Sequence, residues 1–378
     1  MRDEQSQTRV MIVDDSAVIR GLVSRWIEET PGLTVVASHA NGRAAVADIT
    51  VSQPDVVILD IEMPEMDGLT ALPLMLKQKP GLIVLVSSTL TRRGAEVSLK
   101  ALSLGATDYI AKPDATGRVA SAADYRRELT EKVVQLGRRV RGLSSRPVMS
   151  SLTPPASSGS ERRPVEPPPR RSNVGEPVLR SYSHMPPRVL AIGSSTGGPQ
   201  ALMAVLSSSK EALGRVPVLI VQHMPPTFTA LLAEQLGKAS GLASAEAKDG
   251  ERLEAGRVYV APGGKHLVIE KSDGDVVARL LDTEPVNFCK PAVDPMFRSV
   301  SEVYGAATLS VVLTGMGSDG AAGAKVIAAA GGSVIAQDEA TSVVWGMPGA
   351  TAATGACSGI LPLPQIGPKI KSILGGRG

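Results

Sequence analysis

Cysteine, aromatic residues and long apolar runs are all scarce in this chain of 378 residues. Its two cysteines, Cys289 and Cys357, lack the spacing of a metal site, so a disulfide framework is not expected and a reducing compartment fits. The N-terminal stretch MRDEQSQTRVMIVDD is charged and has no apolar signal core, and no apolar run is long enough to span a membrane. We therefore expect a cytoplasmic protein that does not insert into the membrane.

The rest of the composition favours buried parallel sheets. Aromatic residues make up only 3% of the chain, whereas hydrophobic residues as a whole make up 43%, with abundant Val, Ile, Leu, Ala and Gly. This mixture is typical of α/β sheets that are covered on both faces. The length allows two or three domains. The small net charge of +3 gives only weak support for a nucleic-acid partner, and none is expected.

The first third of the chain alternates between strands and helices. Ser16 is placed to cap the first helix, which continues through Trp26. The predicted strands are 9–14, 33–38, 56–60, 82–86 and 107–111, and the further helices are 44–49, 69–76, 95–104 and 126–141. This alternation predicts a doubly wound parallel sheet whose ligands bind beyond the carboxyl ends of its strands.

A proline-rich segment separates this domain from a second one. Residues 147–187 contain ten of the 28 prolines without hydrophobic periodicity, which is typical of a flexible linker. The α/β pattern then returns, with strands at 189–192, 216–221, 257–260, 277–281, 309–313 and 333–335 and helices at 199–206, 230–236, 291–303 and 320–330. We therefore predict domains at 9–125 and 188–375, joined by a helix and linker at 126–187.

Three carboxylates follow two strands of the first predicted sheet. Asp14 and Asp15 end its first strand, and Asp60 ends the third, which is a neighbour in a doubly wound sheet. Carboxylates this close repel one another unless a cation lies among them, and Mg²⁺ suits oxygen ligands near water and phosphate. Lys112 and Ser87 end two other strands, where they can bind phosphate oxygens. An aspartate that is held by a metal and faces a lysine can attack phosphate.

With these residues and the segment MPEMDG, residues 9–125 resemble a response-regulator receiver domain, which has a flavodoxin-like fold. The resemblance implies that Asp60 accepts the phosphoryl group. It implies that Mg²⁺ is the cofactor and is held by Asp14, Asp15, Asp60 and the backbone carbonyl of Glu62. It also implies switch and phosphate-binding roles for Ser87, Tyr109 and Lys112.

A serine lies on the turn between the first strand and the first helix of the second domain. Residues 193–197 match G-x-S-x-G with Ser195 at the centre, and Pro199 suits the start of a helix. Such a turn projects the hydroxyl at the edge of the sheet, and free N–H groups at the helix start can bind an oxyanion. A phosphate-binding turn is the alternative, although the lysine of a phosphate-binding loop is missing.

A base and an orienting carboxylate are available at other strand ends of the second domain. His223 follows strand 216–221, and Asp319 follows strand 309–313 in a glycine-rich turn. His266 is a second candidate for the base. The order Ser, His, Asp differs from the Ser, Asp, His of α/β-hydrolases, so that fold is not expected. A helix-capping Asp319 and a structural His223 are the alternatives.

Residues 188–375 resemble the catalytic domain of the chemotaxis protein-glutamate methylesterases, whose sheet is Rossmann-like. The matching segments are AIGSSTGGP, VQHMP, VYVAPGGKH, KPAVDPMF, LTGMGSDGA and AQDEATSVVWGMPGA. The resemblance implies a catalytic triad of Ser195, His223 and Asp319. It also implies an oxyanion region at Thr196 and Met316. Ser194, at a position that is more often alanine in the family, is an alternative nucleophile.

Together the two resemblances imply a phosphorylation-activated hydrolase in chemotaxis adaptation. Such an enzyme demethylates methyl-glutamate residues of chemoreceptors, releases methanol and deamidates specific receptor glutamines. Its partners are the methyl-accepting receptors as substrates and the chemotaxis histidine kinase as phosphodonor, and the esterase chemistry needs no cofactor. The unphosphorylated receiver is expected to cover the rim of the active site.

Two other functions fit parts of the sequence. A response regulator with a DNA-binding output needs a compact helical domain with a basic recognition helix, whereas residues 188–375 have an α/β pattern. A binding module that keeps the fold without hydrolysis is the second alternative. A serine-directed phosphonate separates it from an enzyme, because only an activated Ser195 reacts.

Overall fold

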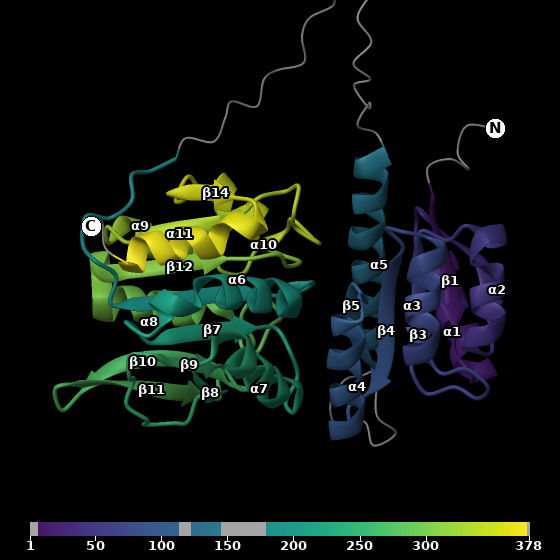
Figure 1. Cartoon of the computed structure of the whole chain (residues 1–378), viewed down its shortest axis with the longest axis horizontal. Coiled ribbons are helices and arrows are strands. Elements are labelled where there is room, and N and C mark those ends of the chain that lie inside the picture. Colours follow the sequence, from purple (N-terminus) through teal and green to yellow (C-terminus); the bar gives the residue numbers. More distant parts are fainter. Residues whose placement is uncertain (1–6, 113–121, 145–178, 376–378) are drawn as a thin grey trace, which may run out of the picture.

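The computed structural model describes residues 7–112, 122–144 and 179–375, which form two α/β domains side by side (Figure 1). Each domain is built on a parallel sheet with helices on its faces, so the predicted fold class is confirmed. Pro113 and most of the predicted linker lie outside the described residues. None of the described helices combines the length and the apolar character needed to cross a membrane.

The N-terminal domain has a five-stranded parallel sheet in the order β2-β1-β3-β4-β5. Its strands are β1 (Thr8–Val13), β2 (Leu33–His39), β3 (Val56–Asp60), β4 (Ile83–Thr89) and β5 (Asp108–Lys112). Its helices are α1 (Ala17–Glu28), α2 (Gly42–Ser52), α3 (Gly68–Gln78), α4 (Arg92–Ser103) and α5 (Ala122–Ser144). Side chains that accept a first-turn N–H begin four of these helices: Ser16, Asn41, Asp67 and Thr91.

The C-terminal domain has a seven-stranded sheet in the order β14-β13-β12-β6-β7-β9-β8. Its strands are β6 (Val189–Ser194), β7 (Val218–Gln222), β8 (Ala243–Glu246), β9 (Arg257–Val260), β12 (Thr308–Val312), β13 (Ser333–Gln337) and β14 (Gly359–Leu361). Its helices are α6 (Gly198–Leu213), α7 (Phe228–Ser240), α8 (Val293–Tyr304), α9 (Ala321–Ala329), α10 (Met347–Ala353) and α11 (Leu363–Gly375). Because β6 has β7 on one side and β12 on the other, the direction of winding reverses at β6, where ligands gather in such sheets.

A few elements differ from the sequence prediction. Residues 277–281 form a strand as predicted, but it belongs to β11 (Asp275–Leu281), which pairs antiparallel with β10 (His266–Ser272) in a separate two-stranded sheet. The prediction missed β8, β10 and β14 and the helices α10 and α11. The missed β8 and β14 are only four and three residues long, too short to show a hydrophobic period.

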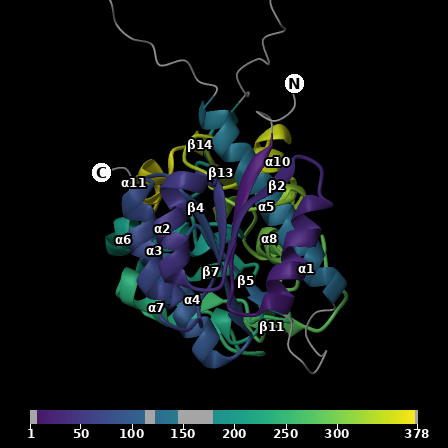
Figure 2. The same ribbon diagram turned by 90° about the vertical axis from the view of Figure 1, so that its right-hand side faces the viewer.

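The two domains pack against each other through apolar side chains that form one continuous cluster. The ring of Tyr109 on β5 stacks on that of Phe228 at the start of α7, and α4 also contacts α6 and α7. The Gln200 side chain donates a hydrogen bond from Nε2 to the Ala106 carbonyl across this interface, at 2.8 Å. Figure 2 views the molecule from the side of the N-terminal domain, which lies in front of much of the C-terminal domain.

Candidate phosphorylation and active sites

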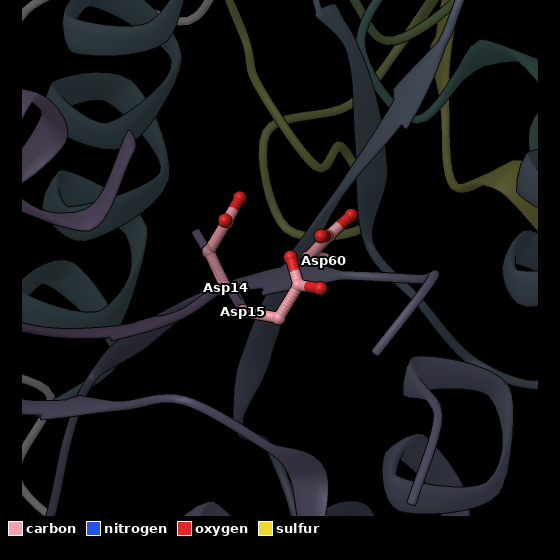
Figure 3. Close-up of side chains that lie close together, drawn as sticks. All are labelled: Asp14, Asp15 and Asp60. Atoms are coloured by element: carbon pink, nitrogen blue, oxygen red, sulfur yellow. The ribbon is translucent and has the colours of Figure 1, made fainter. Parts of the chain in front are cut away.

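The structure brings the three predicted carboxylates together at the carboxyl ends of β1 and β3 (Figure 3). One oxygen from each of Asp14, Asp15 and Asp60 lies within 4.8 Å of the others. Asp14 and Asp60 are buried, whereas Asp15 is exposed. A cavity of about 350 Å³ opens beside Asp60, with Asp15 and Glu62 in its wall. This set of hard oxygen donors beside open space fits a Mg²⁺ ion and a phosphoryl group.

Lys112 supplies the positive charge that these carboxylates require. Its Nζ lies 2.7 Å from Asp14 Oδ2 and 2.9 Å from Asp60 Oδ2. Burial lowers the pKa of Lys112, but the hydrogen bond to Asp14 and the charge of Asp60 together raise it. Burial raises the pKa of Asp60, and the charge of Lys112 opposes this only in part. The lysine therefore stays charged and keeps two partly desolvated carboxylates in place.

The two expected switch residues, Ser87 on β4 and Tyr109 on β5, lie on neighbouring strands. In the part of the chain that the structure describes, no hydrogen bond joins their side chains. The Ser87 hydroxyl lies 3.3 Å from the Tyr125 hydroxyl. Tyr109 is buried, and its ring centroid lies 4.7 Å from that of Phe228 with planes 14° apart. The ring that is expected to respond to phosphorylation is thus part of the domain interface.

The second site lies at the carboxyl ends of β6, β7 and β12. Ser194 at the end of β6 is paired with Gln222 at the end of β7, and the His223 amide donates to the Ser194 carbonyl at 3.1 Å. Ser195 and His223 are therefore the residues that directly follow these two adjacent strands. The Ser195 amide donates to the Thr314 carbonyl just beyond β12, at 3.0 Å. The parallel sheet thus brings three distant segments together.

The predicted base and carboxylate form a hydrogen-bonded pair. His223 Nε2 lies 2.8 Å from Asp319 Oδ2; the Asp319 side chain is buried, and the His223 side chain is 11% exposed. Asp319 also accepts the backbone N–H groups of Val293, Asp294 and Gly320. Burial raises the pKa of Asp319, but the hydrogen bond and charge of His223 and the N–H groups of Val293 and Asp294 lower it overall. The carboxylate is therefore ionised and fixed in orientation.

His223 has an unusual neighbour on its other ring nitrogen. Cys289 Sγ lies 3.3 Å from His223 Nδ1. Burial lowers the pKa of His223, but the charge of Cys289, the hydrogen bond to Asp319 and further contacts with both residues raise it to about 10. The Ser195 hydroxyl makes no hydrogen bond to any residue that the structure describes. Cys289 could not be expected at this site from the sequence, because a loop cysteine without a motif gives no signal.

The alternative site residues have other partners. Ser194 is completely buried, and its hydroxyl donates to Gln222 Oε1 at 2.7 Å. His266 is also completely buried, with Nδ1 accepting the Ala292 N–H and Nε2 directed at the Glu284 carbonyl. Both side chains have structural partners, which favours Ser195 and His223 as the reactive groups.

The residues of the expected oxyanion region, Thr196 and Met316, lie on the segments that follow β6 and β12. Thr196 follows Ser195 and is buried, and its carbonyl accepts the Thr314 hydroxyl. Met316 lies two residues beyond Thr314 and packs against a cluster that includes side chains of the N-terminal domain. Within the described ranges, the backbone N–H groups of Thr196 and Met316 donate no hydrogen bond, so they are available to a ligand.

Comparison with known proteins identifies both halves of the chain. The response regulator receiver domain model matches residues 10–124, and the CheB methylesterase model matches residues 190–370. A protein-glutamate methylesterase/protein-glutamine glutaminase of group 2 operon from Bradyrhizobium diazoefficiens is 53% identical over 99% of this chain and 96% of its own length. A protein-glutamate methylesterase/protein-glutamine glutaminase from Paramagnetospirillum magneticum is 51% identical over 98% of this chain and 97% of its own.

Solved structures resemble each domain separately. The CheB methylesterase catalytic domain of Thermotoga maritima is 40% identical, with a TM-score of 0.47, and the match covers 49% of this chain and 97% of that one. The response regulator domain of Thermotoga maritima CheB is 34% identical, with a TM-score of 0.31, over 36% of this chain and 97% of that one. On the full-length relatives, the chain belongs to the family of protein-glutamate methylesterases/protein-glutamine glutaminases.

Proposed function

We propose that this chain demethylates methyl-glutamate residues of chemoreceptors and deamidates receptor glutamines, with Ser195 as nucleophile, His223 as base and Asp319 as the orienting carboxylate. The observation that carries the assignment of residues is the sheet register. Ser195 and His223 directly follow paired residues of β6 and β7, and His223 is hydrogen-bonded to Asp319. The sequence places a hydroxyl, an imidazole and a carboxylate at one edge of one sheet.

The chemistry follows from which ring nitrogen is free. Nε2 of His223 faces Asp319, so Nδ1 is the nitrogen that takes the proton of the Ser195 hydroxyl. The serine oxygen forms a bond to the δ-carbon of the methyl ester side chain, and the ester C–O bond then breaks. The imidazolium returns its proton to the departing methoxide, which leaves as methanol. Water activated by the same base cleaves the acyl-enzyme and leaves a glutamate.

The negative charge on the carbonyl oxygen needs donors during both steps. The N–H groups of Thr196 and Met316 are free of backbone partners within the described chain. Thr196 follows Ser195 directly, and Met316 lies two residues beyond Thr314, whose carbonyl accepts the Ser195 amide. One such donor typically contributes about 3–4 kcal/mol in the transition state. For a glutamine substrate the leaving group is ammonia, a poorer leaving group than methanol, so deamidation should be slower.

The N-terminal site supports phosphorylation of Asp60. Asp14, Asp15, Asp60 and the Glu62 carbonyl would hold Mg²⁺, whose charge would neutralise the phosphoryl oxygens. Lys112 already contacts Asp60 and can bind a phosphoryl oxygen. Ser87 on β4 is the strand partner of Asp60. The phosphodonor is the chemotaxis histidine kinase.

The domain interface supports control of the esterase by this site. Tyr109 packs directly on Phe228, five residues after His223, so a change in the receiver is transmitted to the active-site segment. A coupling of about 1–3 kcal/mol, typical of allosteric proteins, corresponds to roughly five- to 150-fold activation.

Methanol release from methylated receptor membranes tests the assignment. Wild-type protein should release methanol, and Ser195→Ala should abolish release. Ser194→Ala should remain active, because the Ser194 hydroxyl only supports Gln222. A serine-directed phosphonate should label the wild type and Ser194→Ala but not Ser195→Ala. An active Ser195→Ala enzyme would refute the proposed nucleophile.

A further inference from the structure

A short turn beside His223 is not used by the mechanism above. Val286 and Cys289 exchange two backbone hydrogen bonds, of 3.1 and 2.9 Å, and enclose Asn287 and Phe288. These two residues have φ values of 53° and 62°, the left-handed geometry of a type I′ turn. Such turns prefer glycine at the second position, so Phe288 is held there under backbone strain. We call residues 286–289 the catalytic turn.

Two side chains of the catalytic turn contact the base and its carboxylate. Asn287 Nδ2 donates to Asp319 Oδ1 and to Asp294 Oδ2, both at 3.2 Å. Cys289 Sγ lies 3.3 Å from His223 Nδ1. The turn therefore orients the carboxylate through an amide and contacts the imidazole through a thiol.

The thiol occupies the nitrogen that the reaction needs. Nε2 of His223 is already paired with Asp319, so Nδ1 is the only ring nitrogen left to accept a proton. In this structure Nδ1 faces Cys289, and the Ser195 hydroxyl has no hydrogen-bond partner among the described residues. Cys289 therefore contacts the ring nitrogen of His223 that the Ser195 hydroxyl needs in the proposed reaction.

The same turn reaches the N-terminal domain. Phe288 exposes 91% of its surface, and the guanidinium carbon of Arg127 on α5 lies 5.6 Å from its ring centroid. A cation at this distance is attracted to the face of an aromatic ring. The strained residue of the turn is thus in contact with the domain that carries the phosphorylation site.

We propose that Cys289 is a positioning residue that engages the base in the closed arrangement of the two domains and releases it to Ser195 when the catalytic turn moves. The proposal rests on the triad proposed above. Movement of α5 would remove the Arg127 contact from Phe288, and relaxation of the strained turn would withdraw the thiol from Nδ1.

Methanol release by the full-length chain, with and without acetyl phosphate and Mg²⁺, tests this role. Cys289→Ala should raise the rate without phosphodonor by roughly two- to tenfold, the effect of one ordinary hydrogen bond. The rate with phosphodonor should stay at the wild-type level. Cys289→Ser keeps a group that can hydrogen-bond to Nδ1 and should therefore raise the basal rate by less than Cys289→Ala does. Cys357→Ala, at the buried second cysteine, is the matched control and should behave as the wild type.

A pH profile separates this role from a structural one. The titratable groups that face His223 are Asp319, with Asp294 behind it, and Cys289. Removing the thiol should move the pH dependence of the basal rate to lower pH, whereas a packing defect would lower the rate without moving it.

The outcomes are distinct from those that test the triad. If Ser195→Ala is inactive while Cys289→Ala keeps the wild-type basal rate and pH profile, the role of Cys289 is wrong and the triad stands. A Cys289→Ala enzyme that is slower than the wild type both with and without phosphodonor also overturns the proposed role of Cys289. If Ser195→Ala is fully active, the triad itself is wrong.

Discussion

The rings of Tyr109 and Phe228 stack with their centroids 4.7 Å apart and their planes inclined by 14°. Tyr109 belongs to the last strand of the receiver sheet, and Phe228 begins the helix that follows the segment of His223. Since both rings are buried, the tyrosine cannot leave its position without exposing the phenylalanine. We therefore expect this stack to link the state of the receiver to the packing of the segment that carries His223.

Removing one hydrogen bond of the interface should raise basal activity. In Gln200→Ala the donor to the Ala106 carbonyl is lost, together with a buried Oε1 that has no partner in the described chain. We expect the rate of methanol release without phosphodonor to rise by roughly two- to tenfold, with the phosphorylated rate unchanged. Glu211→Gln, an exposed change on the same helix, is the control. An unaltered basal rate in Gln200→Ala would show that this contact does not hold the domains closed.

Loss of the phospho-acceptor should remove activation and leave the basal reaction. Asp60→Asn lacks the carboxylate oxygen that we propose attacks phosphorus, so acetyl phosphate with Mg²⁺ should no longer increase methanol release. Glu96→Gln, at an exposed ion pair of α4, should respond as the wild type does. Activation of Asp60→Asn would mean that another group accepts the phosphoryl group.

The Lys112 contacts predict an effect on stability that Mg²⁺ reverses. In Lys112→Met two buried carboxylates lose their cation, which should lower the free energy of unfolding of the receiver by about 3–5 kcal/mol. Mg²⁺ should restore more stability to this variant than to the wild type, because it replaces the missing charge. Urea unfolding with Mg²⁺ and with a chelator measures both values. Equal Mg²⁺ effects on the two proteins would contradict a metal site among these carboxylates.

The pKa of His223 predicts the pH dependence of the basal reaction. The pKa is raised to about 10, and the base must be neutral to take the serine proton, so the basal rate should climb as the pH rises from about 6.5 towards about 10. A raised pKa also means that the folded state binds the proton more tightly. Its contribution to stability is therefore complete below about 6.5 and lost as the pH rises through about 10. The free energy of unfolding of His223→Gln should not show this loss of stability at high pH. A wild-type basal rate that stays constant from about pH 6.5 to about pH 10 would contradict the prediction.

Gly315 should tolerate no side chain, because a Cβ there would lie against Ser195. A Cβ there would lie 2.4 Å from Met347 Sδ and 2.9 Å from Ser195 Cβ. Gly315→Ala should cost about 1–3 kcal/mol of stability and, by displacing Ser195, reduce the rate of methanol release by about 100-fold. Gly214→Ala, where a Cβ meets nothing within 4 Å, is the matched control. A fully active Gly315→Ala enzyme would show that the Ser195 position is not set by this contact.

Strand ends explain why so much of both sites could be predicted from sequence. In a parallel sheet the residue after each strand lies at one edge, so Asp60, Lys112 and Ser195 could be placed from hydrophobic runs alone. The contact of Asn287 with Asp319 could not, because it depends on a left-handed turn whose sequence lacks the usual glycine. The stack of Tyr109 on Phe228 joins the two domains. The sequence pattern of each domain predicts its own sheet and helices but does not show which residues meet at the interface.

The apolar cluster shared by both domains has a consequence for how the molecule melts. Because buried side chains such as Leu99 and Leu202 belong to one contiguous core, the unphosphorylated protein should lose its structure in a single calorimetric peak. Opening the interface divides that core, so the activated protein should melt in two separate steps. Heat capacity would then distinguish the resting enzyme from the active one without any substrate.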